Sequence, residues 1–424
     1  MAVVGPEPTI EPERVNLRGM FPGIGRGRNI THGFDNYPAK MIPHMARFLL
    51  ERVSCPGETI LDPFCGSGAV LVESLVNNRK AVGVDFNPYA VLLARAKTTP
   101  YDGDLLEAQL REILKTFSTW RSPFEFQFAN ASYWFTPATL WKLGVVRSAL
   151  ERCTHRMDWA DASFWVAVAA STVRACSRAD TRGPKPFISK KARLERSGRH
   201  FDPFKLFEQK ARAWIALQRD YVATLARTKG SLSVKVLHGD SRELSRLLRN
   251  QRIDAIVTSP PYLNAQDYYR SSKLELLCLG IATTSTLREW SRRVIGSDRI
   301  LLDPDLLEAQ LPCLSAEEVR RALAKRNRKN ACVFAKYVLD MHQVFSEIRK
   351  ILNAGAYCAI VSSYNLISGI VIPTSRIIAD LASNEGFRLD SIFKDKIRDR
   401  WVPTRRNGHD GVIREEHLLV LRRR

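Results

Sequence analysis

The feature that most constrains the fold is a unit of strand, glycine-rich turn, helix and strand in the first quarter of the chain. TILD at 59–62 is a short apolar run that ends in a carboxylate, and FCGSG at 64–68 supplies the turn. AVLVESLVNN at 69–78 is expected to be a helix, and KAVGVDFN at 80–87 is a second apolar strand with an acidic residue near its end. Strands that alternate with helices form a parallel, doubly wound sheet, whose ligands bind at the carboxyl ends of the strands. The sequence therefore predicts an α/β fold with both acidic residues at a ligand site.

The strand pattern returns in the second half of the chain. SVKVLHGD at 233–240, IDAIVTSPPY at 253–262 and GAYCAIVSS at 355–363 each read as a strand, and RLDSIFKDKI and EHLLVLRR supply a final strand pair. These runs predict one doubly wound, mostly parallel sheet of seven strands. We expect an extended, proline- and glycine-rich arm at 1–30, a core made of 31–101, 231–262 and 346–424, and helical insertions at 102–230, which includes a basic loop, and at 263–345.

The balance of charge points to a partner. The 424 residues include 65 Lys and Arg against 44 Asp and Glu, a formal net charge of +21. This excess favours a large polyanion, nucleic acid before a membrane surface, although extra arginine also aids solubility. No apolar run reaches the roughly 18 residues of a membrane helix and no secretory signal pattern opens the chain, so we expect a protein kept inside the cell. The eight cysteines are scattered singly, and we expect neither disulfides nor a metal site.

LDPFCGSG at 61–68 is the first motif with chemical content. Its glycines allow a tight turn that brings the backbone close to a ligand. The spacing is neither G-x-G-x-x-G nor G-x-x-x-x-G-K-[ST], so a nucleoside without phosphates fits better than a dinucleotide or a triphosphate. Asp85, at the end of the next strand, is positioned to accept hydrogen bonds from ribose hydroxyls. The alternative role for Asp62 is to cap the helix at 69–78, and Cys65 is expected to fill space rather than act as a nucleophile.

TSPPY at 258–262 is the second motif. Two prolines directly after a buried strand remove two N–H donors and fix two φ angles. They make either a rigid exit from the strand or a preorganised rim whose carbonyl groups face a substrate amine, with a flat tyrosine ring beside it. The two motifs lie at the same end of the predicted sheet, which favours the second interpretation.

LDPFCGSG, Asp85 and TSPPY together resemble the amino-group DNA methyltransferases, which transfer a methyl group from S-adenosylmethionine to N4 of cytosine or N6 of adenine. HGFDNYPAKMIPHMARFLL at 32–50 looks like the family segment that packs over the methionine end of the cofactor, and HGD at 238–240 resembles the acidic site near the cofactor adenine. The resemblance covers roughly residues 31–98 and 233–424. The large insertion between the second and third strands departs from the simplest family arrangement and leaves open which insertion reads DNA.

The resemblance implies a Rossmann-like methyltransferase core that acts on the exocyclic amine of a base flipped out of duplex DNA. We expect Ser259 Oγ and the carbonyl of Pro260 to accept hydrogen bonds from the amine, Pro261 to hold this geometry and Tyr262 to stack on the base. Serine at this position favours N4 of cytosine, because many adenine enzymes carry Asp or Asn there, although some members with serine act on adenine.

The cofactor site of the family carries over onto matching residues of this chain. Asp62 is expected at the methionine amino group, Asp85 at the ribose and Asp240 at the adenine N6. The other candidates for binding S-adenosylmethionine are Tyr37, Pro38, Lys40, Pro63, Phe64, Cys65, Gly66, Ser67, Gly68, Asn87 and Thr258.

Double-stranded DNA is the partner that the resemblance implies, and basic segments are the expected phosphate contacts, with binding that weakens steeply as salt rises. The resemblance also implies restriction-modification or phage defence in a prokaryotic cytoplasm, at the nucleoid, with a cognate restriction endonuclease or another defence component as a further partner. Oligomeric state stays open. The candidates for nucleic-acid binding are Lys185, Lys190, Lys191, Arg193, Arg270, Lys273, Arg398, Arg405 and Arg406.

Other functions remain open at this stage. An N6-adenine DNA methyltransferase comes next, and then an RNA or tRNA base methyltransferase, which would use the same two motifs. A catalytically silent DNA-binding protein on this scaffold is a further alternative, which the intact glycine, acidic and serine positions disfavour. A nicotinamide oxidoreductase is disfavoured by the glycine spacing.

Overall fold

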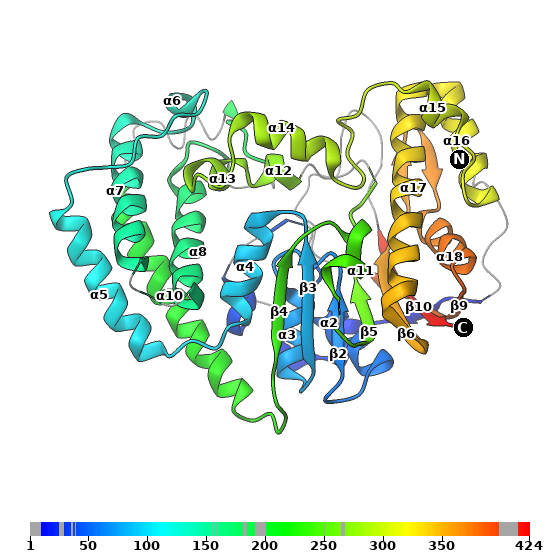
Figure 1. The fold of residues 1–424 in the computed structure, drawn as a ribbon, viewed down its shortest axis with the longest axis horizontal. Coiled ribbons are helices and arrows are strands. Elements are labelled where there is room, and N and C mark those ends of the chain that lie inside the picture. The colour runs from blue at the N-terminus through cyan, green and yellow to red at the C-terminus, as the bar shows by residue number, and fades with distance from the viewer. Residues whose placement is uncertain are drawn as a thin grey trace.

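The computed structural model describes residues 10–24, 29–34, 37–38, 40–155, 157, 159–180, 185–190, 201–249, 251–263, 268–397 and 414–424. Its strands are β1 (Glu13–Val15), β2 (Thr59–Asp62), β3 (Lys80–Asp85), β4 (Val234–His238), β5 (Ile253–Thr258), β6 (Leu352–Ser362), β7 (Asn365–Ile367), β8 (Ile370–Ile372), β9 (Phe387–Lys396) and β10 (Glu415–Arg423). Within the described residues, eight of these strands form one sheet in the order β1-β9-β10-β6-β5-β2-β3-β4, while β7 and β8 pair as a hairpin (Figure 1).

The strand directions are those of a doubly wound fold. Strands β6, β5, β2, β3 and β4 are parallel to one another, and β10 is antiparallel to both β6 and β9. The predicted doubly wound, mostly parallel sheet is therefore confirmed. From β2 the chain proceeds outward to β3 and β4, and it then crosses back to β5 on the other side of β2. This reversal between β2 and β5 is the point at which such sheets bind ligands.

The N-terminal segment departs from the extended arm expected for 1–30, and it gives the sheet an eighth strand. Strand β1 pairs in parallel with β9, whose edge would otherwise present unpaired backbone groups. It is followed by α1 (Leu17–Met20) and the 3-10 helix η1 (Pro22–Ile24). Leu17 is fully buried in an apolar cluster with α2 (Pro43–Val53). Three strand residues among prolines and glycines carry too little periodicity to reveal this pairing.

Both faces of the sheet are covered, because alternate residues of each central strand point to opposite sides. Ile60 joins the apolar cluster beneath α2, whereas its neighbour Leu61 joins the cluster beneath α17 (Arg328–Ile351) and α18 (Thr374–Asn384). In strand β6, likewise, Ala359 lies in the cluster beneath α2 and Ile360 lies in the cluster beneath α17 and α18. Helices α3 (Ala69–Val76), α4 (Pro88–Thr98) and α11 (Leu244–Leu247) connect strands of the same sheet.

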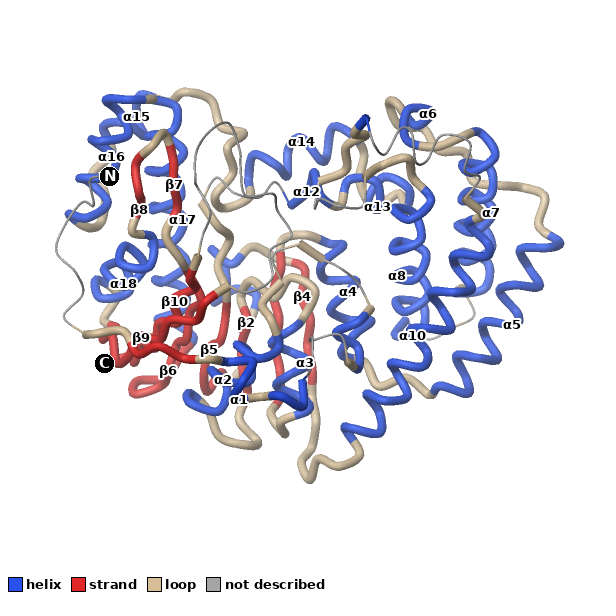
Figure 2. The backbone as a smooth tube through the Cα atoms, turned by 180° about the vertical axis from the view of Figure 1, so that it is seen from behind, coloured by secondary structure: helices blue, strands red, loops and turns tan. Residues whose placement is uncertain are grey.

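The first insertion is helical, in the manner that the sequence indicates. It comprises α5 (Gly103–Thr119), α6 (Ala131–Trp134), α7 (Pro137–Thr154), α8 (Trp159–Cys176) and α10 (Pro203–Leu225), which stand together beside the sheet in Figures 1 and 2. The amphipathic α5 buries Leu106, Leu110, Ile113 and Phe117 against these helices. Among the described helices, none has the length and apolar character needed to cross a membrane.

The second insertion ends earlier than the boundary at 345 that the sequence suggests. Helices α12 (Tyr268–Ser271), α13 (Lys273–Cys278), α14 (Thr284–Arg293), α15 (Pro304–Glu308) and α16 (Leu314–Arg326) precede α17. Helix α17 is continuous from Arg328 to Ile351 and buries one face in the cluster under the sheet, so it belongs to the core. In Figure 1, α12, α13 and α14 form a row between the first insertion and α15–α17.

Candidate active site

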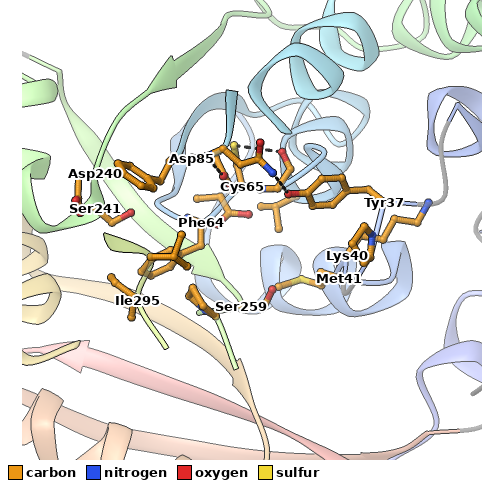
Figure 3. Close-up of a pocket in the computed structure, with 18 of the residues that line it drawn as sticks. Tyr37, Lys40, Met41, Phe64, Cys65, Asp85, Asp240, Ser241, Ser259 and Ile295 are labelled. Carbon is orange, nitrogen blue, oxygen red and sulfur yellow. Dashed lines mark hydrogen bonds between the residues drawn. The ribbon is translucent and has the colours of Figure 1, made fainter. Parts of the chain in front are cut away.

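A pocket lies at the carboxyl ends of β2, β3, β4 and β5 (Figure 3). Twelve of the residues proposed from the sequence line it, and they come from segments more than two hundred residues apart. They are Tyr37, Pro38, Lys40, Asp62, Phe64, Cys65, Gly66, Asp85, Asn87, Asp240, Ser259 and Pro261. Six other proposed residues lie outside its lining: Pro63, Ser67, Gly68, Thr258, Pro260 and Tyr262.

The glycine turn has the backbone that its sequence requires. Gly66 and Gly68 have φ of 49° and 81°, in the left-handed region that glycine tolerates best. A Cβ atom on Gly68 would lie 3.1 Å from the Cα of Ala94, so the turn packs too tightly on α4 for any side chain there. Cys65 is buried, and its backbone N–H donates to Val84 O of β3 at 3.0 Å. The turn is thereby fastened to the neighbouring strand.

Asp62 joins the two motifs. Its Oδ1 accepts hydrogen bonds from Thr258 Oγ1 at 2.6 Å and from the Phe64 N–H at 3.1 Å. The carboxyl group is only 3% exposed, and burial raises its pKa to about 7, since these hydrogen bonds only partly compensate for lost hydration. The N-cap of α3 is Gly68, so the alternative role of Asp62 as a helix cap is wrong.

Asp85 holds the turn from the other side. Its two oxygens accept hydrogen bonds from the N–H groups of Gly66 and Asn87, each at 2.8 Å. Burial raises its pKa to about 6. Asn87 is the N-cap of α4, and its side-chain amide donates to Tyr37 OH at 3.1 Å and to Ser272 Oγ at 3.2 Å. Asn87 therefore ties the Tyr37 segment and the second insertion to the pocket.

Asp240 lies on the opposite wall in an ion-pair network. Arg242 contacts both of its oxygens, with Nη2 2.6 Å from Oδ2 and Nε 3.0 Å from Oδ1, and reaches Asp340 of α17 at 2.8 Å. Burial raises the pKa of Asp240, but the hydrogen bonds and charge of Arg242 outweigh burial and hold it below the usual value. Any further hydrogen bond to Asp240 must use its remaining lone pairs.

Sequence reasoning missed the aromatic wall of the pocket. The Phe86 ring lines the pocket, stands near-parallel to His238 at 27°, and has the Arg293 guanidinium 5.2 Å from its centroid. Tyr269 OH donates to Phe86 O at 2.7 Å. The position of Phe86 directly after Asp85 was a usable signal, whereas Arg293 and Tyr269 come from an insertion whose placement no local pattern reveals.

The SPPY segment leaves β5 beside this pocket. Ser259 and Pro261 line the pocket, and Pro260 is buried behind them. Tyr262 OH donates to Glu416 Oε1 of β10 at 3.1 Å, which fixes the direction of the ring. The hydroxyl group of Thr258 donates its hydrogen bond to Asp62.

The proposed phosphate contacts are only partly within the described residues. Arg270 is exposed, and Lys273 lies over the Trp134 ring, with Nζ 4.4 Å from its centroid. Lys185 is partly exposed and Lys190 exposed, both far along the chain from the pocket residues. The remaining candidates lie outside the described residues: Lys191, Arg193, Arg398, Arg405 and Arg406.

Comparison with known proteins finds similarity to methyltransferases. Residues 9–96 match the model of a DNA methylase family. The type II methyltransferase M.MvaI of Kocuria varians is 24% identical, over 93% of this chain and 91% of the relative. The type II methyltransferase M.BsoBI of Geobacillus stearothermophilus is 23% identical, over 92% and 84% respectively. A solved rRNA methyltransferase, aviRa from Streptomyces viridochromogenes, aligns at 14% identity with a TM-score of 0.29, over 91% of this chain and 87% of that one.

The doubly wound sheet, with its pocket at the carboxyl ends of the strands, has a Rossmann-like fold. The chain is similar to type II methyltransferases over more than nine-tenths of its length, and its residues 9–96 match a DNA methylase model.

Proposed function

We propose that the protein is a type II DNA methyltransferase that transfers the methyl group of S-adenosylmethionine to N4 of a cytosine flipped out of duplex DNA. The observation that carries the proposal is the 2.6 Å hydrogen bond between Thr258 and Asp62, which unites the glycine turn and the SPPY segment. Because of this contact, Ser259 and Pro261 share one pocket with Gly66 and Asp85. A group-transfer enzyme needs this proximity between donor and acceptor sites.

The pocket's chemistry fits this cofactor. Asp62 and Asp85 are buried carboxyl groups with raised pKa values and no cationic side chain within ion-pair distance among the described residues, so a ligand with positive charge would favour their ionised forms. Asp62 would hold the methionine ammonium, Asp85 the ribose hydroxyls and Asp240 the adenine amine, with Phe86 against the adenine ring. When bound, S-adenosylmethionine supplies an electrophilic methyl group on a sulfonium.

The acceptor side depends on this chain's own residues. The lone pair of an exocyclic amine is delocalised into its ring, and accepting hydrogen bonds from its two N–H groups localises that lone pair on nitrogen. Ser259 Oγ and the Pro260 carbonyl would be these acceptors. The two prolines hold the carbonyl direction at little entropic cost, and Glu416 orients Tyr262 for stacking on the base.

Serine in the SPPY segment supports cytosine N4 over adenine N6 as the target. The full-length similarity to M.MvaI and M.BsoBI supports a type II system, and with it a role in restriction-modification.

A methyl-transfer assay tests the proposed substrate class. The protein would be incubated with methyl-labelled S-adenosylmethionine and either duplex DNA or an RNA duplex of matched sequence. We expect label in the DNA alone, and no label when Asp85→Ala replaces the wild type. Label confined to RNA would overturn the proposal in favour of an RNA methyltransferase.

A further inference from the structure

A second, open hollow also has Tyr269 in its lining, so this residue lies between the hollow and the active-site pocket. Its walls are formed by helices α6, α12, α13 and α14, by the segment 299–301 and by Lys329 at the start of α17. Among the described residues that line this groove, none is acidic and six are basic: Arg270, Lys273, Arg288, Arg292, Arg299 and Lys329. We call this hollow the basic groove.

Helix α14 separates the basic groove from the pocket and has no buried residue. One face turns to the groove at helical spacing, through Thr284, Leu287, Arg288, Ser291 and Arg292. The other face packs toward the pocket. There the Trp290 ring lies 5.3 Å from the Tyr269 ring, and Arg293 lies over Phe86. The contacts of Trp290 and Arg293 on the pocket side therefore hold this exposed helix with Arg288 and Arg292 toward the groove.

Three of the six basic residues of the groove lack an ion-pair partner among the described residues, whereas Arg299 lies 3.7 Å from Asp298. Arg288, Arg292 and Lys329 are exposed, and no carboxylate of the described residues lies within ion-pair distance of them. Burial, and then the charge of Arg270, lower the pKa of Lys273. Like charges gathered in one concave surface repel one another unless a polyanion lies between them.

The groove also has an apolar rim. Leu301, which lines it, is 86% exposed and its neighbour Leu302 is 53% exposed. Nucleic-acid surfaces offer phosphates to cations and sugar or base surfaces to such leucines. A concave wall of mixed cations, hydroxyls and leucines fits a duplex strand better than it fits a flat membrane.

We propose that the basic groove holds the phosphate backbone of duplex DNA while the target base enters the neighbouring pocket. The proposal rests on the proposed function and deepens it, because it assigns the DNA surface to the second insertion together with α6 and the start of α17. Helix α14 then links the bound strand directly to the pocket wall at Phe86.

Charge-neutral variants on α14 test the groove. The double variant Arg288→Gln/Arg292→Gln removes two positive charges that face it. The matched control, Arg111→Gln/Lys115→Gln, removes two positive charges from exposed positions on α5, at the outer edge of the first insertion (Figure 1) and outside the lining of the groove. Affinity for a fluorescein-labelled duplex DNA of mixed sequence would be measured by anisotropy at several salt concentrations. Lys329→Gln is a second, independent variant on another wall.

We expect the α14 variant to bind DNA at least about tenfold more weakly at low salt, and to lower the magnitude of the slope of log affinity against log salt by about two. Lys329→Gln should lower it by about one. Affinity for S-adenosylmethionine should be unchanged in both, which shows that the pocket is folded.

A DNA affinity and a salt slope in the α14 and Lys329 variants equal to those of the α5 control would overturn the assignment of the groove. If the wild type methylates DNA while the variants match the control, the proposed function stands and only the groove fails. If the wild type transfers no methyl group to DNA, the proposed function itself fails.

Discussion

At the scale of single residues, the pocket is dominated by two buried carboxyl groups whose environment disfavours their charge. The sequence could predict that Asp62 and Asp85 lie together, because both follow strands of a parallel sheet. It could not predict their partners. Thr258 is nearly two hundred residues from Asp62, and its hydroxyl contact depends on the register between β2 and β5.

The stability of the ligand-free protein should depend on pH through these groups. The pKa values of Asp62 and Asp85 are raised to about 7 and about 6, above the ordinary aspartate value of 3.8. Their protonated forms therefore add stability that is fully present below pH 3.8 and is lost as pH rises through about 6 and then about 7. Thermal unfolding of the wild type should show a fall in Tm between pH 3.8 and about pH 7, and Asp62→Asn should reduce this fall. Equal pH profiles for the two proteins would refute this assignment.

Asp85→Ala should abolish binding of S-adenosylmethionine. The change removes the proposed ribose acceptor and both backbone hydrogen bonds that shape the turn at Gly66. Loss of such charge-assisted bonds predicts at least about a hundredfold weaker affinity in calorimetry. Unchanged affinity would sink the assignment of Asp85 to the cofactor.

Ser259→Ala should separate binding from turnover. Its side chain lines the pocket on the SPPY side, and it is proposed to contact the base rather than the cofactor. We expect cofactor affinity within about twofold of wild type and a methyl-transfer rate lower by about a hundredfold, the scale seen when one preorganised polar partner is removed. A fully active variant would remove Ser259 from the mechanism.

At the scale of elements, the strands with clear apolar runs were predictable and the short or displaced elements were not. Strand β1 is visible only through its pairing with β9. The expected boundary at 345 falls inside helix α17, because the amphipathic pattern of this helix continues without a break from the insertion into the core. Local pattern identifies an element, while its partner is set by contacts distant in the sequence.

The α1 segment should contribute to stability as part of the core. Leu17 is fully buried beneath α2, whereas Met20 on the same short helix is 49% exposed. Leu17→Ala should lower the free energy of unfolding by about 2–5 kcal/mol in urea titrations. The matched Met20→Ala should change it by less than about 0.5 kcal/mol. Similar effects from both variants would mean that this segment does not pack as described.

At the scale of the whole molecule, six of the basic residues that contribute to the net charge of +21 lie together in the basic groove. Arg270 and Lys273, chosen from the sequence, line the basic groove, and the structure adds Arg288, Arg292 and Lys329 to them. The expectation that nucleic acid lies near the pocket came from composition and resemblance. The concave wall could not be predicted from the sequence, because it depends on how α14 packs between the two cavities. That packing rests on aromatic contacts among Tyr269, Trp290 and Phe86.

The central claim is that one pocket, formed by the glycine turn and the SPPY segment, methylates the exocyclic amine of cytosine in DNA. The most direct measurement is mass spectrometry of nucleosides from duplex DNA treated with the protein and S-adenosylmethionine. We predict N4-methyldeoxycytidine, absent when Ser259→Ala is used. N6-methyldeoxyadenosine as the product would contradict the proposed base, and DNA with no methylated amine would contradict the claim as a whole.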